Sequence, residues 1–403
     1  MTDRLYYHDS YVREFDANVL ETIIHEGKTA VVLDRTAFYP SSGGQPFDVG
    51  TLSGANVFDV VDTEDGRILH LVDRVPDGLR VSGRIDWARR FDHMQQHTGQ
   101  HVLSAAFDRL LSARTESFHL GADGSTIDLA RELSPAEIAR GEDEANRVVW
   151  EDRPVTIRFA GPDEIAMLPL RKEPRREGTL RLIDVQDFDL SACGGTHVAR
   201  TGAIGVIAVA ATERFRGGSR VTFLCGGRAL AGYRALRDAV AGSVRALSVL
   251  PAELPAAIER LQADGKDLRR QIKDVQVKLA AREADALADA ATAAGGVTAV
   301  MASLPGWDAA GLKLIAARIV ERPGHVAVLV GDPAPAAIVV ARSTGLPHDA
   351  GALLKQLVER HGGKGGGRPE LAQGGGITSA APDVLQSARE LLTPEAGSPK
   401  PTS

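Results

Sequence analysis

The sequence predicts a multi-domain α+β protein, and three observations lead to this fold class. At roughly 100–200 residues per domain, a chain of 403 residues corresponds to two or three domains. The spacing of hydrophobic residues changes from strand-like runs to helical periodicity and back along the chain. Hydrophobic residues make up 43% of the chain and charged residues 25%, which is typical of a globular protein that buries a core.

The composition also excludes several classes of protein. Lys and Arg number 47 against 53 Asp and Glu, so the net charge is −6 and any nucleic-acid surface must be a local patch. The polar N-terminus does not resemble a signal peptide, and no stretch approaches the roughly 20 apolar residues of a membrane span. Two cysteines cannot build a disulfide framework, which favours a reducing compartment. We therefore expect a soluble, cytoplasmic protein without a membrane partner.

Residues 1–91 are expected to form an N-terminal β-barrel domain. The runs 28–34 and 56–61 are rich in β-branched residues and are bounded by Gly, Asp and Ser, as short strands are. No helical periodicity interrupts this region, which favours a small barrel, with a sandwich as the alternative.

Residues 92–228 are expected to form an α+β domain. From Asp92 onwards, Met94, His97 and His101 follow the spacing of one helical face. Ser134-Pro-Ala-Glu137 combines an N-cap, a Pro at the first helical position and a capping-box Glu, so a second helix begins there. Strand-like segments follow at 155–159, 180–185, 205–211 and 220–224.

The C-terminal part of the chain is expected to contain a helical linker and a small domain. Residues 229–292 have almost no β-branched runs, and apolar residues at 4-3 spacing over 254–279 form a heptad seam that Gly265 interrupts once. This coiled-coil-like seam either packs on a neighbouring helix of the same chain or joins two chains in a homodimer. Residues 293–390 alternate strand and helix patterns, which predicts a small α/β domain, and the Pro/Ser-rich tail 391–403 is expected to be disordered.

Two pairs of residues with the same spacing indicate a metal site. In His97-Thr-Gly-Gln-His101, the i, i+4 spacing places both imidazoles on one face of a helix, about one turn apart. Cys193-Gly-Gly-Thr-His197 adds a thiolate and a third imidazole, and this donor set is typical of tetrahedral zinc. No carboxylate lies between the two helical histidines, so the pattern is not the H-E-x-x-H motif of a metalloprotease. The alternative is that these are unrelated core or surface residues.

These residues and three further motifs resemble one family. His97–His101 with Ser191–Val198 and Thr201–Gly205 is similar to the editing domain of alanyl-tRNA synthetase. Free-standing AlaX-type editing proteins carry the same domain, which is also similar to the second domain of threonyl-tRNA synthetase. Thr36–Pro40, followed by Gly43-Gly-Gln45, Asp48 and Gly50, resembles the signature that precedes this domain. Gly362–Pro369 with Ala372–Gly376 resembles the glycine-rich core of the C-terminal domain, often called DHHA1, of alanyl-tRNA synthetases and long AlaX proteins.

The resemblance implies a long-form, stand-alone editing protein that hydrolyses mischarged tRNA(Ala). The expected substrate carries serine or glycine, and the expected cofactor is one Zn²⁺ per chain, bound by His97, His101, Cys193 and His197. Only 35 residues precede the Thr36 motif, so we expect no aminoacylation domain and no activation of alanine. The resemblance to alanine-tRNA ligases also implies nucleotide binding and ATP binding. Zinc either acts on the ester and on water directly or only positions the substrate. If all four protein ligands bind at once, the ion has no open coordination position, as in structural zinc sites.

Three residues are candidates for substrate recognition. Thr36 matches the family threonine that is expected to hydrogen-bond a seryl hydroxyl, although it is equally compatible with an ordinary strand position. Gln45 and Gln100 are plausible dipoles in the pocket. Ser117 stands where synthetase editing domains commonly have a Gln, which favours the free-standing branch of the family.

Three basic clusters are candidates for tRNA binding, because cations neutralise phosphates. One runs through Arg171, Lys172, Arg175 and Arg176 to Arg181, a second contains Arg214 and Arg216, and the third places Lys364 and Arg368 in a glycine-rich loop. In this family the C-terminal domain is thought to hold the outer corner of tRNA. A solvated charged loop is the alternative explanation for each cluster.

Two other classes of function compete with editing. A zinc- and tRNA-binding protein without catalytic activity would have the same metal ligands. A phosphoesterase is disfavoured, because the chain contains no Asp-His-His cluster.

Overall fold

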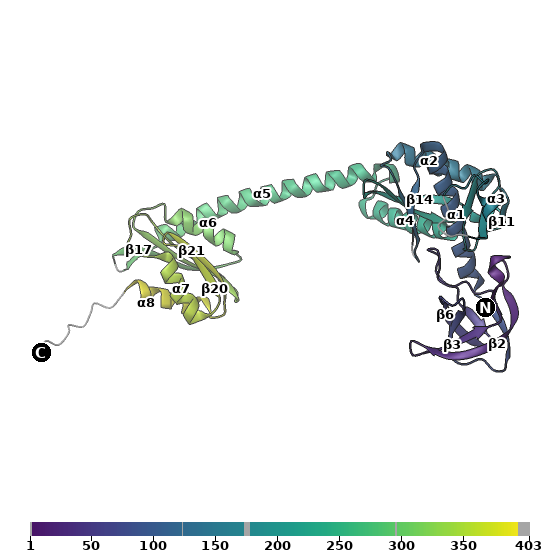
Figure 1. Cartoon of the computed structure of the whole chain (residues 1–403). Coiled ribbons are helices and arrows are strands. Elements are labelled where there is room, and N and C mark those ends of the chain that lie inside the picture. Colours follow the sequence, from purple (N-terminus) through teal and green to yellow (C-terminus); the bar gives the residue numbers. More distant parts are fainter. Residues whose placement is uncertain (1, 123, 173–177, 295, 394–403) are drawn as a thin grey trace. The chain divides into compact units, whose positions relative to one another are not determined.

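The computed structural model describes residues 2–122, 124–172, 178–294 and 296–393. The chain divides into two compact units, Met1–Ala246 and Leu247–Ser403, and Figure 1 shows the elements of each. Among the described residues, none of the helices is both long enough and apolar enough to cross a membrane.

The first unit begins with a closed six-stranded barrel, which confirms the predicted N-terminal fold. Around the barrel the strands follow the order β2 (Glu14–His25), β3 (Lys28–Leu33), β7 (Ile68–Val72), β6 (Ala55–Asp62), β5 (Gly50–Leu52) and β8 (Arg80–Ile85). A short parallel pair, β1 (Asp3–Arg4) and β4 (Arg35–Thr36), lies outside it, and η1 (Leu5–Tyr7) follows β1. The apolar side chains that alternate along the strands fill the barrel.

A long helix, α1 (Trp87–Leu111), leads from the barrel into the second part of the unit. It begins at Asp86, whose side chain accepts a hydrogen bond from the Arg89 amide, as an N-cap residue does. Arg90 on its second turn is fully buried and pairs with the buried Asp48 of the barrel. Its guanidinium also donates to the Ser10 carbonyl at 2.9 Å, so α1 is fixed to the barrel through a satisfied ion pair.

The second part of the unit packs two small sheets against α1 and α2. Helix α2 (Pro135–Trp150) begins with the predicted capping box of Ser134 and Glu137. One sheet contains β14 (Ile207–Phe215), β15 (Gly218–Cys225), β10 (Ser125–Leu129) and β9 (Thr115–Leu120), and the other contains β11 (Val155–Ala160), β12 (Leu180–Val185) and β13 (Asp189–Ala192). The short helix α3 (Pro162–Ile165) lies between β11 and β12, η2 (Thr201–Ile204) lies between β13 and β14 in sequence, and α4 (Gly227–Leu247) follows β15.

The packing around α1 is tight at Gly99. A Cβ at this position would lie 2.3 Å from the Cys225 Sγ, so only glycine lets the helix approach β15 this closely. Cys225 is fully buried in this core, and burial raises the pKa of its thiol well above the usual range. It acts as a small apolar side chain, apart from the proposed metal ligands.

The second unit begins with η3 (Pro251–Glu253) and the helix α5 (Leu254–Asp289), which carries the predicted heptad seam. The seam is exposed: the solvent-exposed fractions of Leu261, Leu268 and Val275 are 60%, 57% and 62%. Towards its C-terminus, α5 packs instead through Ala280 and Ala284 against α6 (Ala309–Ile319).

The C-terminal domain is a six-stranded mixed sheet with helices on both faces. Its strands follow the order β16 (Thr292–Ala294), β17 (Val297–Pro305), β18 (His325–Asp332), β19 (Ala336–Arg342), β21 (Leu371–Ile377) and β20 (Lys364–Arg368). Alternate residues of the central strands pack against α6 on one face and against α7 (Ala350–His361) and α8 (Ala381–Leu392) on the other. The glycine-rich segment was expected to be a loop, and this is wrong: it forms the β20–β21 hairpin, because glycines without side chains let the two backbones pair closely.

Candidate metal centre

The four proposed ligands come together in the first unit. His97 and His101 lie one turn apart on α1, and Cys193 and His197 flank the turn that follows β13. One ligand atom from each residue lies within 4.8 Å of all the others. The turn approaches α1 so closely that a Cβ on Gly195 would lie 2.2 Å from the His97 Cε1, which explains the glycine at this position.

Hydrogen bonds from outside the cluster orient all three imidazoles. The Nδ1 atom of His97 lies 2.8 Å from the Gln45 Oε1, that of His101 lies 3.1 Å from the Asp189 Oδ2, and that of His197 lies 3.2 Å from the Thr98 Oγ1. The Gln45 amide oxygen and the Asp189 carboxylate can only accept, so His97 and His101 carry a proton on Nδ1 and direct Nε2 towards the cluster, whereas the Thr98 hydroxyl can take either role. The Nε2 atoms of His97 and His197 lie 3.3 and 3.4 Å from the Cys193 Sγ.

The electrostatics favour a thiolate among imidazoles. Burial opposes ionisation of Cys193, but His97, His197 and a hydrogen bond from His101 lower the pKa of the thiol well below its usual value. Burial lowers the pKa of His197 to about 3, which keeps this imidazole neutral at pH 7. Burial opposes a charge on His101, but hydrogen bonds to Asp189 and Cys193 raise its pKa to about 9, so a metal bound there would displace the Nε2 proton. A thiolate and imidazoles are the donors that zinc prefers, so the residues present fit this ion.

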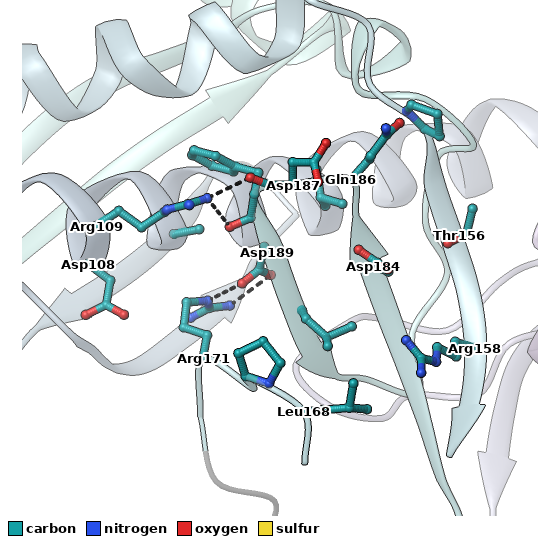
Figure 2. A pocket seen from close by; sticks show the side chains of 16 residues that line it. Asp108, Arg109, Thr156, Arg158, Leu168, Arg171, Asp184, Gln186, Asp187 and Asp189 are labelled. Carbon is teal, nitrogen blue, oxygen red and sulfur yellow. Dashed lines mark hydrogen bonds and ion pairs between the residues drawn. The ribbon is translucent and has the colours of Figure 1, made fainter. Parts of the chain in front are cut away.

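The carboxylate of Asp189 links His101 to the guanidinium of Arg171. The Arg171 Nε donates to the Asp189 Oδ1 at 2.6 Å, and Ser191 donates to the same carboxylate. Burial opposes a charge on Asp189, but His101 and Arg171 lower its pKa to about 2. Figure 2 shows this pair at the edge of a cavity of about 730 Å³ between α1, β11 and the β12–β13 hairpin. Of the residues that line the cavity, Asp189 is the one with a hydrogen bond to a proposed ligand.

The three predicted recognition residues occupy different surroundings. Gln45 is a partner of the ligands: its Oε1 holds His97, and its Nε2 donates to the Thr196 Oγ1 at 2.8 Å. Gln100 is buried and donates to Ser104 on the same helix, and its side chain has no hydrogen bond to a ligand among the described contacts. Thr36, at the end of β4, is buried against the barrel, where its Oγ1 lies 2.7 Å from the Nε2 of His70 on β7 and accepts from the Phe38 amide.

The basic clusters also differ in their placement. Arg171 is largely buried by its pair with Asp189, whereas Lys172 is exposed and donates to the Glu116 carbonyl of β9. Arg214 and Arg216 are exposed beside the β14–β15 turn, and Arg214 pairs with Glu132. Lys364 and Arg368 are exposed on the edge strand β20. Arg175 and Arg176 lie outside the described residues.

Sequence reasoning missed the supporting roles of three residues, one of which, Arg181, was assigned to a basic cluster for tRNA binding but is buried. Thr98 and Asp189 hold histidines, and the buried Arg181 donates to the Cys193 carbonyl at 2.6 Å and to the Tyr7 carbonyl at 2.9 Å. Asp189 and Ser191 alternate along β13 and Cys193 follows it at the same two-residue spacing, which was a detectable signal that they share a face. The role of Arg181 depends on a contact across 174 positions of sequence and had no local signal.

Three family descriptions match parts of the chain. Residues 4–89 match tRNA synthetases class II (A), residues 180–221 match the threonyl and alanyl tRNA synthetase second additional domain, and residues 296–393 match the DHHA1 domain. The match over 180–221 contains Cys193 and His197.

Relatives match nearly the whole chain. The alanyl-tRNA editing protein AlaX-L of Pyrococcus horikoshii is 31% identical over 388 residues, which cover 93% of this chain and 94% of that protein. Alanine–tRNA ligases of Halorubrum lacusprofundi and Pyrococcus furiosus are 37% and 34% identical over 96% and 93% of this chain. The chain spans only 44% and 42% of these two ligases, which is less than half their length.

We predict that Asp189→Asn weakens metal binding. The amide keeps the shape of the side chain but removes the charge that holds His101 and Arg171, and loss of such an outer partner typically costs about 10–100-fold in metal affinity. Competition with a chelator measures the affinity. Asp184→Asn is the matched control, because Asp184 lines the same cavity from β12 and has no hydrogen bond to a ligand among the described contacts. Equal affinities of the two variants would contradict the role of Asp189.

Proposed function

The chain belongs to the alanyl-tRNA editing proteins of the AlaX-L family, and from this premise we propose that it deacylates mischarged tRNA(Ala). The proposed reaction hydrolyses the ester between tRNA and a wrong amino acid, serine or glycine, and so maintains the fidelity of translation. The observation that carries this proposal is the cluster of His97, His101, Cys193 and His197, whose donor atoms already face one another in a buried site.

We propose that these four residues hold one Zn²⁺ per chain. Bound there, zinc would polarise the ester or fix the aminoacyl group and a water molecule in place. The chain's own residues set the conditions for this. Gln45 and Asp189 keep the Nδ1 proton on His97 and His101 and direct Nε2 towards the cluster, and Thr98 contacts the Nδ1 of His197. Arg181 holds the Cys193 turn against the N-terminal segment, so the ligands stay together without large rearrangement.

A second candidate is a zinc- and tRNA-binding protein without catalytic activity. One observation favours it: four protein ligands complete a tetrahedral shell, which is typical of structural zinc. The two candidates differ in one measurable property, because only the editing protein releases serine or glycine from tRNA(Ala).

We predict that Cys193→Ala combined with His97→Ala removes zinc and deacylation together. The variant keeps only two of the four donors, which are too few for a tight site. Elemental analysis measures zinc, and release of labelled serine or glycine from charged tRNA(Ala) measures activity. Cys225→Ala is the control, because this buried thiol lies outside the cluster and both readouts should stay unchanged. Undiminished zinc in the double variant would overturn the ligand assignment, and zinc-loaded wild type that binds tRNA without deacylating it would favour the second candidate.

Selection of serine over alanine is proposed to involve the hydroxyl of Thr36. Burial lowers the pKa of His70 to about 4, and its Nδ1 lies 2.9 Å from the Val31 carbonyl, which can only accept. The His70 Nε2 is therefore an acceptor, and the Thr36 hydroxyl donates its proton to it. Since Thr36 also accepts from the Phe38 amide, one lone pair is left for a donor such as a seryl hydroxyl. Alanine has no such donor. A site that hydrogen-bonds a substrate hydroxyl strongly rejects a substrate that lacks this hydroxyl.

We predict that Thr36→Val narrows the ratio of Ser-tRNA to Ala-tRNA hydrolysis by about tenfold or more. One neutral hydrogen bond is worth about 0.5–1.5 kcal/mol, and more when a buried partner is left unsatisfied. Single-turnover rates on both substrates measure the ratio, and zinc content checks the fold. Thr22→Val, at an exposed position of the same barrel, should leave the ratio unchanged. An unchanged ratio in Thr36→Val would remove this residue from substrate recognition.

The second unit is proposed to hold tRNA and to join two chains. Lys364 and Arg368 on β20 would neutralise phosphates, together with Arg171, Lys172, Arg175, Arg176, Arg214 and Arg216 in the first unit. The seam of α5 has Ile at a positions such as 258 and 272 and Leu at d positions such as 261 and 268, which favours a parallel two-stranded coiled coil. In that register, Asp264 at a g position faces Arg269 of the second chain at an e position.

We predict that a chain truncated after Ala246 keeps zinc and turnover at saturating tRNA but is a monomer with weaker binding. Tethering two contacts raises avidity by about 10²–10⁴. The truncation should also lose affinity less steeply with salt, because fewer phosphates are neutralised. Sedimentation measures the association state, and a salt series of deacylation rates measures the tRNA contact. If a soluble, zinc-loaded truncation has the same affinity for tRNA and the same salt slope as the full chain, the second unit does not bind tRNA. If it has the same association state as the full chain, the second unit does not join two chains.

A further inference from the structure

An aromatic side chain lies beside the proposed ligand His97. Phe118 is on β9, which is the edge strand of its sheet, and 36% of its surface is exposed. Its ring centroid lies 6.0 Å from that of His97, at an interplanar angle of 41°. Phe118 is thus a partly exposed aromatic ring beside a buried polar cluster.

The backbone of the barrel is shaped to accept this ring. A Cβ on Gly44 would lie 2.8 Å from the Phe118 Cε2, and the φ of +81° at Gly44 also favours glycine. Gly44 directly precedes Gln45, which holds the His97 Nδ1. One edge of the Phe118 ring is thus fixed against the same turn that orients a metal ligand, while the rest of the ring stays open.

A cation from another segment contacts the same strand. The exposed Lys172 donates through its Nζ to the carbonyl of Glu116, two residues before Phe118. Single-stranded nucleic acids are bound by this combination of an aromatic face, on which a base stacks, and a nearby cation for the phosphate.

We propose that Phe118 is a stacking platform for the terminal base of the tRNA acceptor end. This inference rests on the proposed function, in which the aminoacylated 3′ adenosine must reach the metal centre. Stacking of its base on Phe118 would place the attached ester beside His97, and Lys172 would neutralise an adjacent phosphate. Because every base has an aromatic face, the platform recognises an unpaired end and not a particular sequence.

The test uses full-length, zinc-loaded protein and an uncharged RNA hairpin whose single-stranded 3′ end terminates in 2-aminopurine. Fluorescence of this base is quenched when it stacks. We expect wild type to quench it, Phe118→Leu to bind about 5- to 150-fold more weakly with loss of quenching, and Phe118→Tyr to retain both properties. Phe58→Leu is the matched control: Phe58 is 40% exposed and has the Lys28 Nζ 5.5 Å from its ring, but it lies on β6 of the barrel.

Two outcomes of the quenching experiment would overturn the platform. One is quenching and affinity in Phe118→Leu equal to those of wild type. The other is loss of zinc from Phe118→Leu with quenching that persists, which would give the ring only a packing role. Deacylation of Ser-tRNA measured in parallel separates this inference from the proposed function. Quenching that depends on Phe118 without deacylation by wild type would refute the function alone, and normal deacylation with an unchanged KM in Phe118→Leu would refute the platform alone.

Discussion

The first unit depends on a single geometric constraint, which is that three imidazoles must present Nε2 to one point. A histidine in isolation has two tautomers and free rotation, so each ring needs a partner on its other nitrogen. The partners come from three separate elements: Gln45 from the barrel, Thr98 from α1 itself and Asp189 from β13. The fold therefore has to bring a barrel loop, a helix and a hairpin to the same place, and the buried Arg90–Asp48 pair fixes the first two.

Close approach of backbones is the second requirement of the same centre. Gly195 lets the ligand turn approach His97, Gly99 lets α1 approach β15, and Gly44 lets the barrel loop approach Phe118. Each glycine lies where a Cβ would come within 2.8 Å of a neighbouring side chain. The glycines in these motifs are thus packing residues, and they decide how tightly the elements close around the ligands.

Local patterns predicted much of this architecture because their causes are local. The capping box at Ser134, the barrel strands and the i, i+4 histidines are set by neighbours within a few residues. The pairing of Cys193 with His97 was inferred from the donor types, although 96 positions separate them. The partners of the ligands were harder to predict, because Asp189 and Arg181 are ordinary strand residues until the chain folds. The glycine-rich hairpin was taken for a loop because glycine usually weakens strands, whereas here it allows the close pairing of β20 with β21.

The hydrogen bonds of the Gln45 side-chain amide couple metal binding to the attachment of the barrel. Its Oε1 accepts from both His97 and the Thr196 backbone, and its Nε2 donates to the Thr196 hydroxyl, so one barrel residue connects α1 with the ligand turn. An ion that orders this turn also strengthens the attachment of the barrel, and by linkage the attached barrel raises the affinity for the ion by the same factor. Substitutions within the barrel can therefore change metal affinity without touching a ligand. If the proposed metal binds there, its depletion would correspondingly loosen the barrel, and the stability of the domain junction would follow the supply of that metal.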